Sequence, residues 1–153
     1  MNRVIHPDVV CNLALAILAS STAPSLLLDG DLTVIAGSTS FYAAFALEPQ
    51  NVAGRPVFKL GAGEWDVPQL RLLLSATLCG HARIEAYEMD LKGGAAPRRL
   101  VLNAQKLDYG DAEQVRLLLT ISDVTEARIS EKLKDDLLRE KAILLQELQH
   151  RVA

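Results

Sequence analysis

Residues 115–128 read VRLLLTISDVTEAR, and this stretch decides the fold. Apolar and polar side chains alternate through residues 115–122, which predicts a strand with one buried face. The side chains expected on that face are Val115, Leu117, Leu119 and Ile121. The opposite face carries Arg116, Thr120 and Ser122, with Leu118 as the exception to the pattern.

The strand is expected to pass directly into a helix. Asp123 is followed three residues later by Glu126, a spacing typical of a capping box, in which Asp123 accepts an amide of the first turn and Glu126 reaches back. A distortion of the sheet would then rotate or shift the helix, with Asp123, Val124, Thr125 and Glu126 as the coupling point. An ordinary helix cap without a signalling role is the alternative.

The segments before this joint predict the rest of the sheet. Strands are expected at 83–90 and 99–107, separated by turns at 92–97 and 108–111, and at 26–28 and 32–35 around Asp29-Gly30, a strong hairpin signal. Helices are expected at 38–47 and, capped by Asp66, up to about Leu78, with Trp65 packed at the start of the latter. This order predicts an α+β fold, a five-stranded antiparallel sheet with helices across one face.

The N-terminal residues 9–19 are apolar except for Asn12. Small residues follow, as in a secretion signal, but Pro7 and Asp8 stand where a basic flank would be. The run is also shorter than the ~20 residues that span a bilayer. We therefore expect a flanking helix with Pro7 in its first turn, buried against the domain or a second copy of the chain, and no membrane span.

The bulk composition fits one domain with an appendage. The chain has 153 residues, half of them hydrophobic, and a net charge of −3. A nucleic-acid binder usually carries a basic patch, so that class is disfavoured. Cys11 and Cys79 do not make a disulfide framework, and a cytoplasmic location is expected.

Residues 124–153 contain no Gly and no Pro, which predicts a long C-terminal helix. Its apolar stripe comprises Leu133, Leu137, Leu144, Leu148 and Val152, widened by Leu138 and Leu145. One small domain cannot bury such a stripe, so we expect the helix to pair with its twin as a coiled coil that runs into a four-helix bundle. A helix folded back on its own sheet is the alternative.

The tail closes with Glu147-Leu148-Gln149-His150-Arg151-Val152. His150 lies about 200° around the helix from Leu148, so it points away from the stripe. A neutral imidazole is a competent nucleophile near neutral pH. Glu147, one turn earlier, is the candidate to orient the ring. An exposed histidine without a chemical role is the alternative.

The order of elements and the residues at its joints resemble a PAS sensory domain. The resemblance covers about residues 24–125 and is carried by Asp29-Gly30, by Glu48 to Arg55 (EPQNVAGR) and by Asp123-Val124-Thr125. It implies a flanking helix at 1–23, a PAS domain at 24–125 and a signalling helix at 126–153. One departure is that Ser38 or a neighbour replaces the asparagine often found after the second strand.

Residues 147–152 resemble the phosphoacceptor box of HWE-related histidine kinases, which reads His-Arg-Val/x-x-Asn. The resemblance implies that His150 is the phosphoacceptor and Arg151 a box residue on the first helix of a dimerisation and phosphotransfer bundle. The asparagine of the box would follow Ala153. We therefore expect the chain to be part of a longer bacterial kinase whose ATP-binding domain lies elsewhere, and to be inactive alone.

Cofactor signals are weak. PAS domains can enclose haem, flavin or a metabolite, but the Asn-Cys-Arg-Phe-type motif of the photoactive subgroup is absent from this sequence. His81, alone beside Gly80, is a poor candidate for a haem ligand. No cofactor is evident, the PAS ligand is unknown, and ATP and Mg²⁺ are expected only in the intact kinase.

The sequence therefore favours the sensory and partial phosphoacceptor segment of a two-component sensor histidine kinase. Its expected partners are a second copy, through the N-terminal helix and the coiled coil, and the receiver domain of a response regulator. In the alternative, the chain is a stand-alone dimeric PAS interaction module and His150 is incidental.

Overall fold

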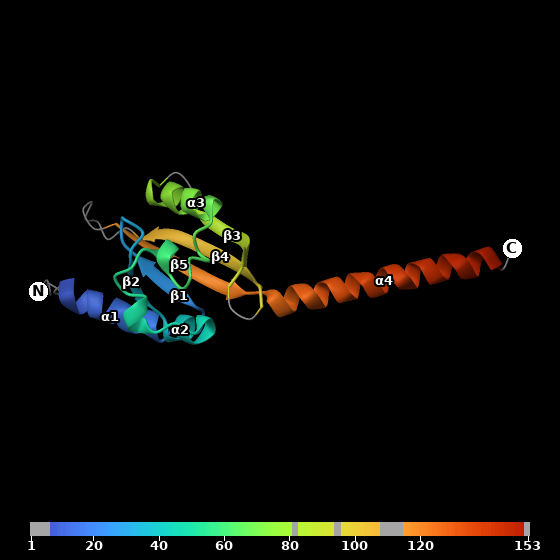
Figure 1. Cartoon of the computed structure of the whole chain (residues 1–153), viewed down its shortest axis with the longest axis horizontal. Coiled ribbons are helices and arrows are strands. Elements are labelled where there is room, and N and C mark those ends of the chain that lie inside the picture. The colour runs from blue at the N-terminus through green and yellow to red at the C-terminus, as the bar shows by residue number, and fades with distance from the viewer. Residues whose placement is uncertain (1–6, 81–82, 94–95, 108–114, 152–153) are drawn as a thin grey trace, which may run out of the picture.

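The computed structural model describes residues 7–80, 83–93, 96–107 and 115–151. Its helices are α1 (Pro7–Ala19), α2 (Thr39–Phe45), α3 (Pro68–Leu78) and α4 (Thr125–Arg151), with short 3₁₀ turns at Pro49–Asn51 and Val57–Lys59. Its strands are β1 (Ser25–Leu28), β2 (Val34–Gly37), β3 (Ile84–Leu91), β4 (Arg98–Leu107) and β5 (Arg116–Asp123). Figure 1 shows a small domain from which α4 extends as a rod.

The strands of the described residues form a single antiparallel sheet in the order β2-β1-β5-β4-β3. β5 lies at its centre, and Leu117, Leu119 and Ile121 are fully buried, as the alternation in the sequence predicts. The expected α+β class and five-stranded sheet are therefore confirmed. The turn expected at 108–111 lies outside the described residues.

The hairpin between β1 and β2 is longer than predicted. One carboxylate oxygen of Asp29 accepts the amides of Asp31 at 2.9 Å and Thr33 at 3.0 Å. Leu32, expected in the strand, takes a left-handed conformation with φ 63° instead. The Asx-type turn built by Asp29 therefore delays the start of the strand to Val34.

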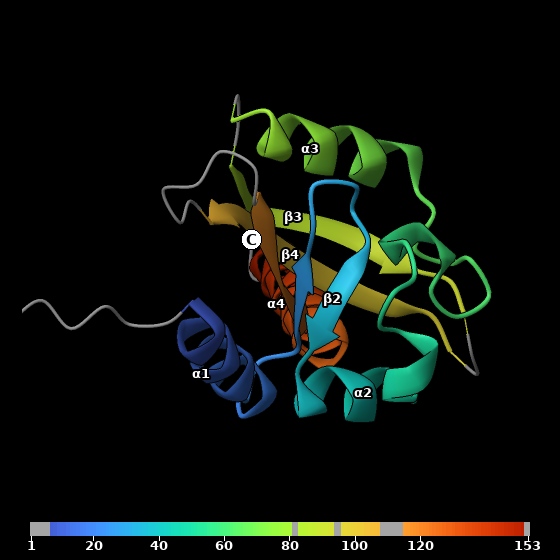
Figure 2. The same cartoon turned by 90° about the vertical axis from the view of Figure 1, so that its left-hand side faces the viewer.

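Helices α2 and α3 cover one face of the sheet, and the core lies between the two layers (Figure 2). Trp65 is fully buried there, with its ring centroid 5.3 Å from that of Phe45 and 6.2 Å from that of Phe41. The sequence placed Trp65 at the start of α3, whereas its ring packs against the aromatic side chains of α2.

Asp66 does not cap α3, contrary to the sequence-based expectation. The N-cap position is Val67, without a side-chain hydrogen bond, and Pro68 opens the helix. The Asp66 carboxylate pairs instead with the guanidinium of Arg71. Pro68 has no N–H to cap, so part of the need for a capping side chain disappears.

Ser38 caps α2. Its hydroxyl accepts the amide of Phe41 at 3.1 Å and the amide of Ser25 at 2.9 Å, and it lies 2.8 Å from the hydroxyl of Ser40. These hydrogen bonds join the start of α2 to the start of β1, and the Ser38 side chain that makes them is fully buried.

Replacing Ser38 with alanine is expected to lower the free energy of unfolding by about 1–3 kcal/mol, because a cap is lost and the buried amide of Ser25 is left without its acceptor. Urea unfolding followed by circular dichroism measures the change. Ser20→Ala is the matched control, because among the described residues the Ser20 hydroxyl donates to an exposed carbonyl, that of Ile17. Equal stability of Ser38→Ala and the parent chain would contradict the prediction.

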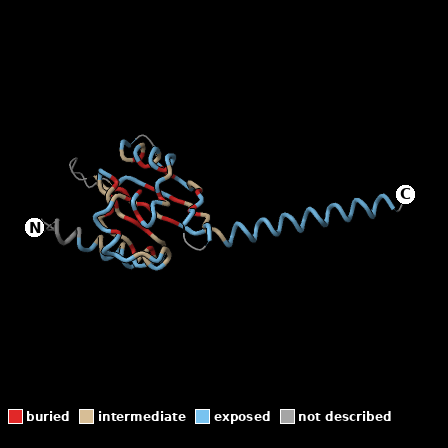
Figure 3. The backbone as a smooth tube through the Cα atoms, viewed as in Figure 1, coloured by how far each residue is buried: buried red, intermediate tan, exposed pale blue. Residues whose placement is uncertain are grey.

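The two terminal helices leave apolar side chains exposed. Helix α1 contacts β2 and leaves Leu13 and Ile17 62% and 63% exposed, so the single chain does not bury it fully as expected. Every residue of α4 beyond Thr125 is exposed (Figure 3). This excludes the alternative in which the long helix folds back on its own sheet. None of the helices in the described ranges has the length and apolar character needed to cross a membrane.

Candidate functional site

The joint between β5 and α4 continues the ladder of the sheet beyond its last strand pair. Asp123 pairs with Leu100 at the end of the β4–β5 ladder. The amide of Val124 then donates to the carbonyl of Arg99 at 2.9 Å, and the amide of Arg99 donates to the Thr125 hydroxyl at 2.9 Å. A side-chain oxygen thus takes the place of a backbone carbonyl, and the first residue of α4 is fastened to β4.

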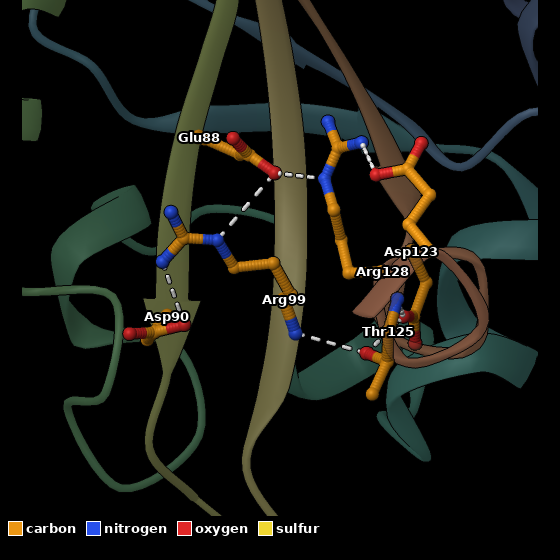
Figure 4. Close-up of polar contacts among 7 residues, drawn as sticks. Glu88, Asp90, Arg99, Asp123, Thr125 and Arg128 are labelled. Atoms are coloured by element: carbon orange, nitrogen blue, oxygen red, sulfur yellow. Dashed lines mark hydrogen bonds and ion pairs between the residues drawn. The ribbon is translucent and has the colours of Figure 1, made fainter. Parts of the chain in front are cut away.

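Asp123 closes the joint from the other side. Its Oδ1 accepts the amide of Thr125 at 3.0 Å and also the Thr125 hydroxyl (Figure 4). The predicted acceptance of a first-turn amide by Asp123 is therefore confirmed. The reciprocal half of the capping box is wrong, because no hydrogen bond joins Glu126 to Asp123 among the described residues. Helix α4 begins at Thr125, which places Glu126 one position too early to reach back.

A charged cluster links the first turn of α4 to strands β3 and β4. The guanidinium of Arg128 donates to Glu88 on β3 at 2.6 Å, and Arg99 lies 3.5 Å from the same carboxylate oxygen. Arg99 also donates to Asp90 at 2.9 Å. Figure 4 shows Glu88 between the two guanidinium groups. The orientation of α4 is therefore set by strands β3, β4 and β5 together.

The hydrogen bond from Arg128, together with the positive charges of Arg128 and Arg99, holds the pKa of the Glu88 carboxyl below its ordinary value. A carboxylate with a lowered folded-state pKa stabilises the fold above its unfolded pKa, about 4.3 for Glu. That contribution is lost as the pH falls through the folded-state pKa.

Glu88→Gln is expected to lower the thermal midpoint slightly at pH 7, and the two midpoints should converge once the pH is below the folded-state pKa of Glu88. The effect is small because the pair is partly solvated. Thermal unfolding at a series of pH values measures it. Glu131→Gln is the control, because it removes the partner of Arg128 within α4 at 3.0 Å and leaves the link to β3 in place. A difference that grows toward acid pH would contradict this account.

The phosphoacceptor candidates lie at the far end of α4. Glu147, His150 and Arg151 are all exposed, His150 and Arg151 in the last turn. No hydrogen bond or ion pair joins Glu147 to His150 in the described part of the chain, so the orienting role of Glu147 stays a prediction. Val152 and His81 lie outside the described residues.

The sequence indicated the residues of the joint that are near in the chain and missed those that are distant. Asp123, Val124 and Thr125 are brought together as the spacing predicts. Glu88 was missed because it lies 40 residues before Arg128 in the chain. A charged residue in a strand is usually solvated, and no local pattern marks this one as a partner of the helix.

The residues of the described ranges offer no group of three or more His, Cys, Asp or Glu side chains placed to hold a metal ion. An open hollow of about 350 Å³ adjoins the joint and is lined by Glu88, Arg99, Thr125, Arg128 and Ile129, among others. Four of its charged residues, Glu88, Asp90, Arg99 and Arg128, form ion pairs among themselves. The hydrogen bonds and ion pairs of the joint fix the direction in which α4 leaves the sheet.

Comparison with known proteins places this geometry in a family. The model of the PAS fold matches residues 18–129. Among curated proteins, none matches the sequence significantly.

Solved structures share the fold at low identity. The PAS domain of BvgS from Bordetella pertussis is 14% identical, with a TM-score of 0.58 over 86% of this chain and 98% of that domain. The photoactive yellow protein domain of the sensor histidine kinase Ppr from Rhodospirillum centenum is 15% identical, with a TM-score of 0.58 over 75% and 97%. The PAS domain of nitrogen regulation protein NR(II) from Vibrio parahaemolyticus is 16% identical, with a TM-score of 0.54 over 72% and 97%. At these identities the likeness establishes the fold alone.

Proposed function

The chain belongs to the PAS fold family, and from this premise we propose that it is the sensory and partial phosphoacceptor segment of a cytoplasmic two-component sensor histidine kinase. The domain at 24–125 senses a stimulus and biases the direction of α4. The helix carries that bias as a coiled coil toward His150, which accepts a phosphoryl group. Sensor histidine kinases among the proteins of similar fold make this class the natural one to test.

One observation carries the proposal: the start of α4 is held to the sheet by hydrogen bonds and ion pairs, while the rest of the helix is exposed. Helix α4 spans Thr125–Arg151, and its apolar side chains have no cover in the single chain. A contiguous exposed apolar face usually marks an interaction surface. A second copy of the chain would cover the stripe in a parallel coiled coil and leave His150 outside the seam.

The proposed chemistry needs only the imidazole from this chain. A neutral ring nitrogen of His150 attacks the γ-phosphorus of ATP held by a kinase domain, and ADP leaves. The receiver domain of a response regulator then takes the phosphoryl group from the histidine onto an aspartate. ATP and Mg²⁺ belong to the kinase domain in this scheme.

The test is phosphoryl transfer in trans. The purified chain is mixed with a separately produced kinase domain of an HWE-related histidine kinase and ATP labelled at the γ-phosphate. Label on the chain that is acid-labile, as a phosphorus–nitrogen bond is, supports the proposal. Absence of label from the parent chain counts against it.

A second candidate function uses the same surfaces without phosphoryl transfer. Leu13 and Ile17 on α1 offer another exposed apolar strip, so both terminal helices provide faces for a partner. A dimeric PAS interaction module would use them and leave His150 without a role. A stable dimer that never accepts label would favour this candidate.

A further inference from the structure

Arg98 contacts both the helical layer and the joint. Its guanidinium donates to the carbonyl of Ala44, in the last turn of α2, and lies 5.2 Å from the centroid of the Phe45 ring. On its other side, Nε lies 3.9 Å from Oδ2 of Asp123. One side chain at the start of β4 therefore spans from α2 to the residue that holds the first turn of α4.

The contacts on the side of α2 lead into the core. The Phe45 ring is 4.9 Å from that of Phe41 and 5.3 Å from that of Trp65, and both of these partners are fully buried. Interiors this closely packed transmit a displacement rather than absorb it. A rearrangement of the aromatic cluster therefore moves Phe45 and the end of α2, and with them the guanidinium of Arg98.

The two carboxylate oxygens of Asp123 make different contacts. Oδ1 holds the amide and hydroxyl of Thr125, while Oδ2 faces Arg98. Moving the guanidinium changes the field at the carboxylate and the direction in which it turns. The planar fork of arginine allows the carbonyl of Ala44 and Asp123 to be contacted together, which the point charge of lysine does not allow.

We propose that Arg98 is the positioning residue that couples the aromatic interior to the start of α4. The Glu88–Arg128 pair fastens the helix to β3, whereas Arg98 makes its direction respond to the interior. This inference deepens the proposed function, on which it rests for its purpose, but it does not involve His150.

The experiment is a double-mutant cycle on the whole chain, with hydrogen exchange of the Arg128 amide measured by NMR. That amide donates to the carbonyl of Val124 at 2.9 Å and reports opening of the first turn. Phe45→Leu disturbs the cluster, and Arg98→Met keeps an apolar stem but removes the charge and the donors. We expect each single variant to raise the exchange rate, Arg98→Met by about tenfold, and the double variant to exchange no faster than Arg98→Met.

Non-additivity is the readout that a merely structural Arg98 would not give. If Phe45→Leu accelerates exchange equally in both backgrounds, or if Arg98→Met leaves the rate unchanged, the inference is overturned. Arg71→Met is the matched control, because Arg71 also lies over a ring, 4.4 Å from Phe58, and pairs with a carboxylate, Asp66, but does not touch the joint. It should leave the Arg128 amide unchanged.

Arg98→Lys serves if Arg98→Met does not fold. It keeps the charge but loses the fork, and we expect it to weaken the response to Phe45→Leu by at least half; an undiminished response would overturn the inference. If the parent chain takes no phosphoryl label but the double-mutant cycle is non-additive, the proposed function alone is defeated. An additive cycle in a chain that takes label would defeat the Arg98 inference alone.

Discussion

Replacing His150 with alanine is expected to reduce phosphoryl label on the chain to background. The label is a phosphorus–nitrogen bond, so removal of the imidazole removes the acceptor itself. The other histidines of the sequence, His6 and His81, lie far from the helix end in the chain. Counting acid-labile label after incubation with the kinase domain and labelled ATP measures the effect.

Two neighbouring variants make the result specific. Gln149→Ala changes an exposed residue beside His150 and should keep the full label. Glu147→Gln removes the proposed orienting carboxylate and should slow labelling without abolishing it, because the ring can still reach the phosphate. Equal label on His150→Ala and the parent chain would place the acceptor elsewhere and defeat the assignment.

The architecture was predictable because it depends on patterns that are local in the chain. The alternation in residues 115–122 identified the central strand and its buried face, and the long stretch without Gly or Pro identified α4. The boundaries differ by one or two residues where a side chain bonds the backbone. Asp29, for example, moves the start of β2 by holding the amides of Asp31 and Thr33.

The energetics of the joint were only partly predictable, because half of them are tertiary. Asp123 and Thr125 lie two residues apart, and their hydrogen bond follows from helix-capping rules. Glu88 lies on β3 and Arg98 on β4. The role of Glu88 depends on the β3–β4 register, which places Asp90 opposite Arg99, and the contact of Arg98 with Asp123 depends on the β4–β5 register, which places Leu100 opposite Asp123. No local pattern in a single sequence specifies which residues of two paired strands lie opposite each other.

Replacing both Leu137 and Leu144 with alanine is expected to weaken self-association of the chain by about a thousandfold. These leucines lie two helical turns apart, are 65% and 59% exposed in the single chain, and form the centre of the proposed seam. Each buried leucine contributes about 2 kcal/mol or more, and a dimer loses two from each copy. The four truncated leucines of a dimer would therefore cost about 8 kcal/mol if they were fully buried. A two-stranded seam buries them only in part, so we take half of this cost, about 4 kcal/mol, which raises Kd about a thousandfold.

Sedimentation velocity over a dilution series measures the change, and the domain itself should be unaffected. Among the residues that the structure describes, α4 bonds the sheet through its first turn, where Thr125 and Arg128 contact β4 and β3, and Leu137 and Leu144 lie exposed beyond that turn. Leu72→Ala is the matched control, because Leu72 is 70% exposed on α3, and it should leave Kd unchanged. A parent chain that stays monomeric at the highest concentration, or a double variant with an unchanged Kd, would mean that the apolar stripe of α4 serves another partner. The coiled-coil route from the sheet to His150 would then fail, because the joint fixes the start of α4 and the proposed second copy is what would carry that direction over the roughly 40 Å that 27 residues span.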